Sequence, residues 1–177
     1  KTAGLVGLGA IGKQLASIIQ SIGMTVLAYD PYVTDIPAGV ALTDLQSVLM
    51  ESDFVATLAP ITTETKNMLD ASMLSKMKSG AFLIMASGIA IADQDSLLSF
   101  LNSGAIGGAA VDVFDTHPVA PGNPLLTARN IVLTPHIAGA TAETIRRHSQ
   151  MITDDLILFL EGKTPINAIN PQVLKNL

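Results

Sequence analysis

A glycine-rich hexapeptide near the start of the chain has the residue types and spacing of a turn that binds phosphate groups. In "GLGAIG", Gly7, Gly9 and Gly12 follow the pattern G-x-G-x-x-G. The first glycine of such a turn permits a sharp bend, the second lets the backbone approach a pyrophosphate, and the third lets a helix pack against a strand. The backbone of Ala10 and of Ile11, where a helix is expected to begin, would then offer amide hydrogens to the phosphates.

The segments around this turn fit a dinucleotide-binding unit. A strand over 3–8 precedes the turn, and a helix over 11–22 follows it. A second strand, over 24–29, ends at Asp30, eighteen residues after the last glycine. A carboxylate there accepts hydrogen bonds from ribose hydroxyls and repels a 2′-phosphate, so we expect NAD as cofactor rather than NADP. The alternative is that the glycines serve only helix packing and that Asp30 merely starts a turn.

Short apolar runs alternate with helical patterns along the rest of the chain, which is typical of a parallel sheet covered by helices on both faces. Four further strands are expected, over 53–59, 81–86, 106–114 and 130–135. Further helices are expected from a cap at Thr43 to Met50, from a cap at Asp93 to Asn102 and over 141–161, with one or two short helices between Thr62 and Lys78. The sequence therefore predicts an α/β fold with a doubly wound parallel sheet of the Rossmann type.

Composition limits the partners of the protein. With 177 residues, a net charge of −5 and a pI near 4.9, the chain lacks the basic surface that binds nucleic acid or an anionic membrane. The absence of cysteine excludes disulfides and thiolate metal sites, no metal is expected, and a reducing, cytoplasmic location fits. A mean hydropathy of +0.46 predicts apolar surface left over for a missing partner domain or subunit; the alternative is a core rich in alanine and isoleucine.

Four stretches, "GLVGLGAIGKQLA", "LDASMLSKMKSGAFLI", "GGAAVDVF" and "NIVLTPHIAGAT", resemble the cofactor-binding domain of D-isomer-specific 2-hydroxyacid dehydrogenases. In that family the cofactor domain is inserted into a smaller substrate domain. The resemblance implies that 1–162 form the NAD-binding domain and that 163–177 return to a missing substrate domain. It also implies that Lys1 is not a natural N-terminus and that the isolated chain is inactive.

The resemblance further implies a hydride transfer between NAD(H) and a 2-hydroxy or 2-keto acid. His136 matches the histidine that exchanges the hydroxyl proton, and Asp112 matches the residue that bonds the nicotinamide carboxamide. The alternatives are a surface histidine and a buried capping carboxylate. Further cofactor contacts are implied at Pro60, Thr65, Ala86, Ser87, Gly88 and Gly139, and at His136 itself.

The chain departs from the family at two catalytic positions. Within "GAFLIMASGIAIAD" (80–93), the family arginine that holds the substrate carboxylate falls on Gly88, or on Ser87 if one gap is allowed. The family glutamate falls on His117, whose imidazole would disfavour protonation of His136 if the two meet. The alternative is a solvated His117 satisfied by Asp115. The "H-x-P" motif that many family members carry after the third strand reads Leu58–Ala59–Pro60 in this chain.

These departures leave three hypotheses open. The first is a dehydrogenase whose substrate is anchored by other groups; the second is a catalytically silent NAD(H)-binding paralogue that acts as a sensor or interaction module. The third is a drifted fragment without a role. We attribute the apolar character of 80–92 to the absent cation. That segment and the resemblance to the family together imply a homodimer through the cofactor domains.

Overall fold

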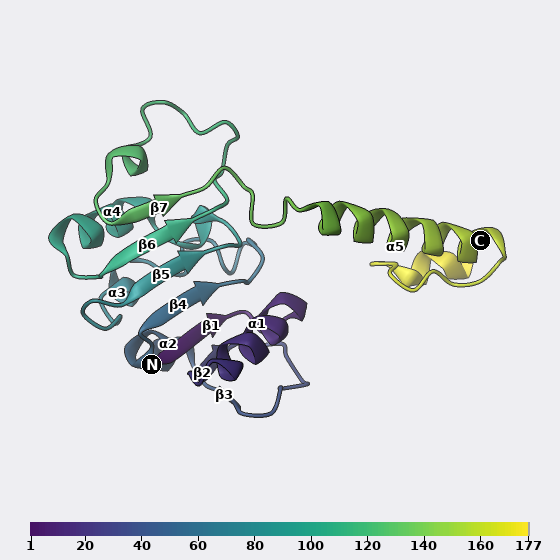
Figure 1. Ribbon diagram of the computed structural model, residues 1–177, viewed down its shortest axis with the longest axis horizontal. Coiled ribbons are helices and arrows are strands. Elements are labelled where there is room, and N and C mark those ends of the chain that lie inside the picture. Colours follow the sequence, from purple (N-terminus) through teal and green to yellow (C-terminus); the bar gives the residue numbers. More distant parts are fainter. Residues whose placement is uncertain (177) are drawn as a thin grey trace. The chain divides into compact units, whose positions relative to one another are not determined.

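The computed structural model describes residues 1–176, and residues 2–133 contain a parallel sheet of seven strands (Figure 1). The strands are β1 (Thr2–Val6), β2 (Thr25–Tyr29), β3 (Val40–Leu42), β4 (Phe54–Thr57), β5 (Phe82–Met85), β6 (Gly108–Val111) and β7 (Ile131–Leu133). Their order is β3-β2-β1-β4-β5-β6-β7. The order reverses between β1 and β4, and ligands of such sheets bind at the carboxyl ends of the strands at this reversal. The six predicted strands are confirmed with shorter bounds, and β3 was not predicted.

Five α-helices connect the strands and continue the chain. They are α1 (Ala10–Ser21), α2 (Leu45–Glu51), α3 (Ala71–Leu74), α4 (Gln94–Ser103) and α5 (Ala142–Leu160). The predicted cap at Asp93 is confirmed, because its carboxylate accepts a hydrogen bond from the Ser96 amide. The predicted cap at Thr43 is wrong: Asp44 caps α2 by accepting from the Ser47 amide at 2.9 Å.

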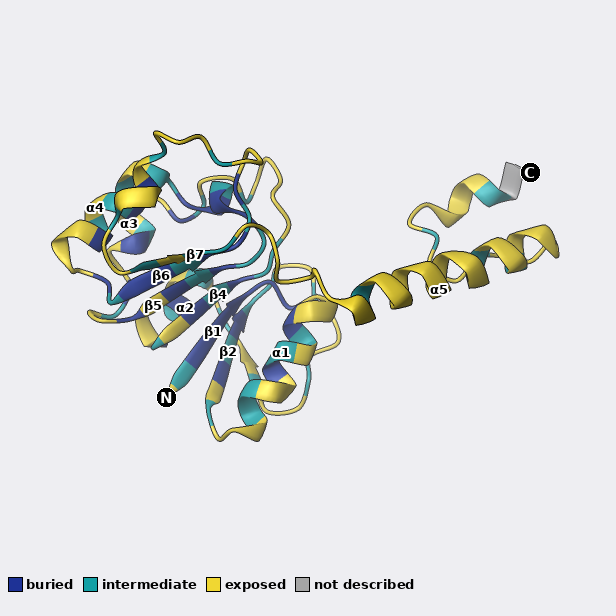
Figure 2. Cartoon of the chain, turned by 45° about the horizontal axis from the view of Figure 1, so that its top comes forward, coloured by how far each residue is buried: buried dark blue, intermediate teal, exposed yellow. Residues whose placement is uncertain are grey.

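Helices lie on both faces of the sheet, and each face has its own hydrophobic core, although one face stays uncovered over β4 to β7. On one face, α1 packs through Ala16 against Leu5 and Val26. On the other face, α2, α3 and α4 pack against the central strands, with Leu83 and Leu97 fully buried. Figure 2 shows that the central strands are the main buried part of this fold. The doubly wound architecture predicted from the alternating pattern is thus confirmed.

The apolar loop after β5 belongs to the larger of these cores. Ile89 and Ile91 lie in a short 3₁₀ helix, η1 (Ile89–Ile91), and are 1% and 0% exposed. Ala92 is buried beside them. The interpretation that this segment is apolar because a cation is missing is therefore wrong for these residues, which are apolar because they fill the core. For the same reason, the buried part of 80–92 offers no surface to a second subunit.

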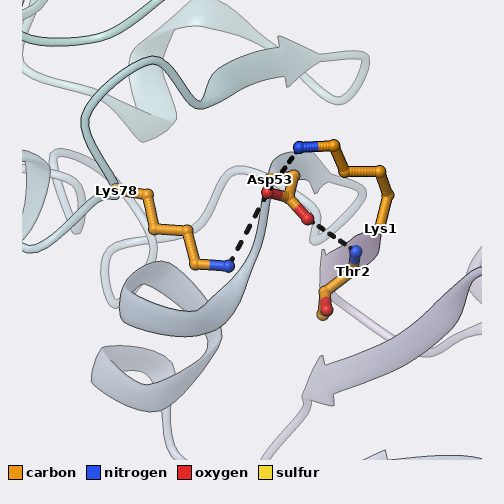
Figure 3. Close-up of polar contacts among 4 residues, drawn as sticks. All are labelled: Lys1, Thr2, Asp53 and Lys78. Carbon is orange, nitrogen blue, oxygen red and sulfur yellow. Dashed lines mark hydrogen bonds and ion pairs between the residues drawn. The ribbon is translucent and has the colours of Figure 1, made fainter.

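A carboxylate at the amino ends of the strands joins β1 to β4. The Asp53 side chain accepts a hydrogen bond from the Thr2 amide at 2.8 Å, and it pairs with Lys1 at 3.2 Å and Lys78 at 3.7 Å (Figure 3). The Thr2 amide is the largest cause that lowers the pKa of Asp53, and the two ammonium groups add to it. The ionised side chain therefore stabilises the junction of these strands.

The chain divides into two compact units, Lys1–His136 and Ile137–Leu177. The second unit consists of α5 and the segment that follows it, including the 3₁₀ helix η3 (Pro171–Asn176). Within this unit, the Asp155 carboxylate accepts hydrogen bonds from the amides of Ile166, at 2.8 Å, and Asn167, at 3.1 Å. No helix in the described part of the chain is long and apolar enough to cross a bilayer.

Candidate cofactor-binding site

The glycine turn between β1 and α1 has the geometry that a pyrophosphate needs. Gly7 has a φ of +105°, and a Cβ there would lie 2.6 Å from the Ala59 amide nitrogen, so only glycine fits. A Cβ on Gly12 would collide with the Gly7 carbonyl, which explains the close packing of α1. A Cβ on Gly9 would meet nothing within 4 Å. The space in front of Gly9 is therefore open to a ligand.

The N-terminus of α1 faces this open space without a side-chain cap. Gly9 occupies the N-cap position, and among the described residues no side chain accepts a hydrogen bond from the first amides of the helix. The helix begins at Ala10, one residue before its expected start at Ile11. Its uncapped amides and positive dipole end suit an anionic group, as the sequence predicted.

Asp30 follows β2 and uses three of its acceptor positions to hold the backbone. One carboxylate oxygen accepts from the Leu8 amide at 2.8 Å, inside the glycine turn. The other oxygen accepts from the amides of Tyr32, at 2.9 Å, and Val33, at 3.0 Å. A carboxylate offers about four lone-pair sites. One site thus remains for a ribose hydroxyl, so Asp30 both shapes the turn and fits the role of cofactor ligand.

A cavity of about 120 Å³ lies at the carboxyl ends of β1, β2 and β4. It is lined by Val6, Gly7, Tyr29, Asp30, Pro31, Tyr32, Ala59, Pro60, Glu64, Thr65 and Met68. Two of the predicted contacts, Pro60 and Thr65, are thus brought beside Asp30, and the Thr65 hydroxyl donates to the Pro60 carbonyl at 2.6 Å. Sequence reasoning missed Tyr32 and Glu64, which carry no local motif.

The segment after β5 lies next to the end of β4. The amides of Ala86 and Ser87 donate to the Thr57 carbonyl at 3.3 and 3.2 Å. The Ser87 hydroxyl is buried and has no hydrogen-bond partner among the described residues. Gly88 is buried with φ 152° and ψ 147°, and a Cβ there would lie 3.1 Å from Ile61 Cγ1. Position 88 therefore holds an apolar contact, and its backbone conformation is one that glycine favours.

Asp112 and His136 meet at the ends of β6 and β7. Asp112 is 9% exposed, and its carboxylate accepts a hydrogen bond from the Thr134 hydroxyl at 2.5 Å. The His136 amide donates to the Asp112 carbonyl at 2.9 Å. His136 has a φ of +56°, a left-handed conformation that is uncommon outside glycine. His136 thus lies, in this uncommon backbone conformation, at the edge of the sheet where ligands of this fold bind.

The imidazoles of His117 and His136 are neighbours. Their ring centroids lie 5.2 Å apart, and the ring planes are inclined by 35°. The alternative in which His117 is a solvated side chain that never meets His136 is therefore wrong. Gly139, the remaining predicted contact, lies in the second unit, in the turn before α5, where its carbonyl accepts from the Thr141 amide.

Comparison with known proteins places these features in a family. Residues 1–138 match the model of the D-isomer specific 2-hydroxyacid dehydrogenase NAD binding domain. The chain is 39% identical to a glyoxylate reductase of Korarchaeum cryptofilum over 99% of its own length and 54% of the relative's. It is 36% identical to a D-3-phosphoglycerate dehydrogenase of Archaeoglobus fulgidus, over 96% of the chain and 33% of the relative.

A solved structure of a D-lactate dehydrogenase is also similar to this chain. The NAD⁺ complex of D-lactate dehydrogenase from Lactobacillus jensenii superposes with a TM-score of 0.85 at 27% identity, over 94% of this chain and 54% of that one. The chain thus spans about half the length of the glyoxylate reductase and the lactate dehydrogenase that it matches. The chain belongs to the D-isomer specific 2-hydroxyacid dehydrogenase family, as an NAD-binding domain.

Proposed function

We propose that this chain is the cofactor-binding half of an NAD-dependent oxidoreductase that transfers a hydride between NAD(H) and a small 2-hydroxy or 2-keto acid. The observation that carries the proposal is the placement of His136 beside the buried Asp112, at the same sheet edge as the glycine turn and Asp30. A proton-exchanging group and a dinucleotide site at one edge are what this reaction needs.

Each residue then has a chemical role. The glycine turn and the N-terminus of α1 bind the pyrophosphate, and Asp30 binds a ribose hydroxyl. A nicotinamide cofactor held by these residues would supply or take up the hydride. Asp112, oriented by Thr134, binds the carboxamide, and His136 holds or releases the hydroxyl proton. Because Gly88 offers no cation, groups other than residue 88 must hold the substrate carboxylate.

A second candidate function is a catalytically silent NAD(H)-binding module. Two observations favour it: Gly88 has a glycine-specific backbone and packs against Ile61, and His117 contacts His136 where the family has a glutamate. Glycine supplies no positive charge, and histidine cannot supply the negative charge of a glutamate. Both candidates share the cofactor site and differ only in turnover.

Calorimetric titration of this chain with NADH and then NADPH tests the cofactor site, which both candidate functions require. We expect micromolar binding of NADH and much weaker binding of NADPH; failure to bind either would overturn the cofactor site. Turnover of glyoxylate and of hydroxypyruvate with NADH, measured on the protein at its full natural length, then separates the candidates. A dehydrogenase loses its rate in His136→Gln but keeps NADH affinity, whereas a silent module shows no rate in either form.

We also propose that the protein acts in the cytoplasm and as a homodimer through this domain. The absence of cysteine supports a reducing compartment. An apolar groove over β4 to β7 supports self-association: Phe54, Phe82 and Val132 line it and are 38%, 44% and 63% exposed. Sedimentation velocity on the chain tests the oligomeric state.

A further inference from the structure

The cavity at the carboxyl ends of β1, β2 and β4 contains a second carboxylate besides Asp30. Glu64 comes from the loop after β4, and Tyr32 comes from the loop after β2. The Tyr32 hydroxyl donates a hydrogen bond to Glu64 Oε2 at 2.6 Å, which joins the two loops. Neither residue has a role in the glycine turn or in the histidine pair.

Local contacts hold both partners of this hydrogen bond in place. The Tyr32 amide donates to Asp30, so the ring is anchored next to the first carboxylate. The Glu64 amide donates to the Thr62 hydroxyl at 3.2 Å. The hydrogen bond and negative charge of Glu64 raise the pKa of Tyr32, so the phenol stays a neutral donor at neutral pH. Glu64 is therefore held at the cavity by contacts from both loops.

The charged side chains that line the cavity are all acidic. The described residues that line it include two carboxylates, Asp30 and Glu64, and neither lysine nor arginine. A phosphate monoester carries a charge of about −1.5 to −2 at pH 7. Two nearby carboxylates would repel such a group, and no cation on the lining would compensate.

We propose that Glu64 is a specificity-determining residue that, together with Asp30, excludes the 2′-phosphate of NADP(H). The proposal rests on binding of the cofactor at this cavity, which is part of the proposed function. Family membership does not decide the choice of cofactor, because the similar solved structures include complexes with NAD and complexes with NADPH. The preference for one cofactor over the other must therefore come from individual residues such as Glu64.

The test is a calorimetric titration of NADH and NADPH into wild type, Glu64→Gln and Glu51→Gln. Glutamine keeps an acceptor for the Tyr32 hydroxyl and removes only the charge. Glu51 is an exposed glutamate at the end of α2, before β4 begins, and its replacement changes the net charge equally. We expect Glu64→Gln to tighten NADPH about three- to tenfold and to change NADH less than about twofold, and we expect Glu51→Gln to change neither.

Two further measurements, a titration at high salt and the variant Glu64→Asp, distinguish an effect of the charge of Glu64 from an effect of its shape. The gain in Glu64→Gln should shrink when the titration is repeated at about 1 M salt, where charges are screened beyond about 3 Å. Glu64→Asp should keep most of the wild-type preference. An unchanged NADPH-to-NADH affinity ratio in Glu64→Gln, with NADH binding intact, overturns the role of Glu64 alone. If wild type binds neither cofactor, the cofactor site itself is wrong, and this proposal is overturned with it.

Discussion

At the scale of single residues, Gly88 has surroundings that leave little room for a side chain. A φ of 152° with ψ 147° is a backbone region that glycine alone adopts readily. Ile61 already occupies the space that a side chain would need. Gly88→Arg alone would therefore strain the loop.

The crowding and backbone conformation at Gly88 predict that a single added methyl group destabilises the fold. Gly88→Ala should lower the free energy of unfolding by about 1–3 kcal/mol, because alanine is strained at this φ and its Cβ approaches Ile61. Gly122→Ala is the matched control, since a Cβ there meets nothing within 4 Å and its φ is ordinary. Urea denaturation of both variants measures the difference. Equal stabilities would contradict a glycine-specific conformation at position 88.

Asp53 predicts a dependence of stability on pH. Its pKa is lowered in the folded protein, first by the Thr2 amide and further by Lys1 and Lys78, so the ionised form stabilises the fold. That contribution is complete above the usual aspartate pKa of about 3.9 and is lost as the pH falls through the lowered value. Asp53→Asn should therefore be less stable than wild type at pH 7, and the difference should shrink below about pH 4. Urea titrations across this range measure it; a constant difference would refute the assignment.

Some residues of the site belong to a short sequence motif, and others are brought to the site only by contacts between distant parts of the chain. Gly7, Gly12 and Asp30 follow a short pattern whose reason is backbone geometry, so the sequence predicts their surroundings well. Glu64 has no such pattern, because its partner Tyr32 lies 32 residues away and meets it only across two loops. The contact of His117 with His136 was one of two open alternatives, and the fold decides between them.

At the scale of elements, the sequence predicted strands rich in β-branched residues and failed where that signal was weak. The missed strand β3 has three residues of which only Val40 is β-branched, whereas the equally short β7 begins with two β-branched residues, Ile131 and Val132. At the start of α2, Thr43 and Asp44 are both good caps, and only the backbone conformation selects Asp44. Such choices depend on neighbouring elements.

The contact of β1 with α2 supplies a prediction at this scale. A Cβ on Gly4 would lie 2.6 Å from Val48 Cγ1 and would collide with the buried Ser52 hydroxyl, so α2 can approach β1 only over a glycine. Gly4→Ala should lower the free energy of unfolding by about 1–3 kcal/mol through overpacking. Ser52→Ala removes the nearest atom, which has no hydrogen-bond partner among the described residues, and should recover part of the loss. A double-mutant cycle by urea denaturation measures this coupling, and strict additivity would contradict the contact.

At the scale of the whole molecule, the high hydropathy of the chain is explained by where its apolar side chains lie. The prediction of leftover apolar surface is confirmed within the described residues. The stacked rings of Phe54 and Phe82, 5.6 Å apart, stay partly exposed on the sheet, and Val132 beside them is 63% exposed. The buried loop 89–92 takes no part in this surface. The proposed dimer should therefore use the groove over β4 to β7 and not the segment from which a dimer was first expected.

Val132→Lys tests that placement. A lysine on β7 would put a charge into the groove, which costs little in a monomer exposed to water but is unfavourable in a buried contact. We expect wild type to sediment as a dimer at micromolar concentration and Val132→Lys to sediment as a monomer with unchanged circular dichroism. Leu126→Lys is the control, because Leu126 is also exposed, at 47%, and lies outside the groove. A monomeric wild type would refute the dimer, whereas a dimeric Val132→Lys would move it to another surface. Either outcome would still leave the cofactor site intact, since no residue lining the cavity beside Asp30 lines the groove.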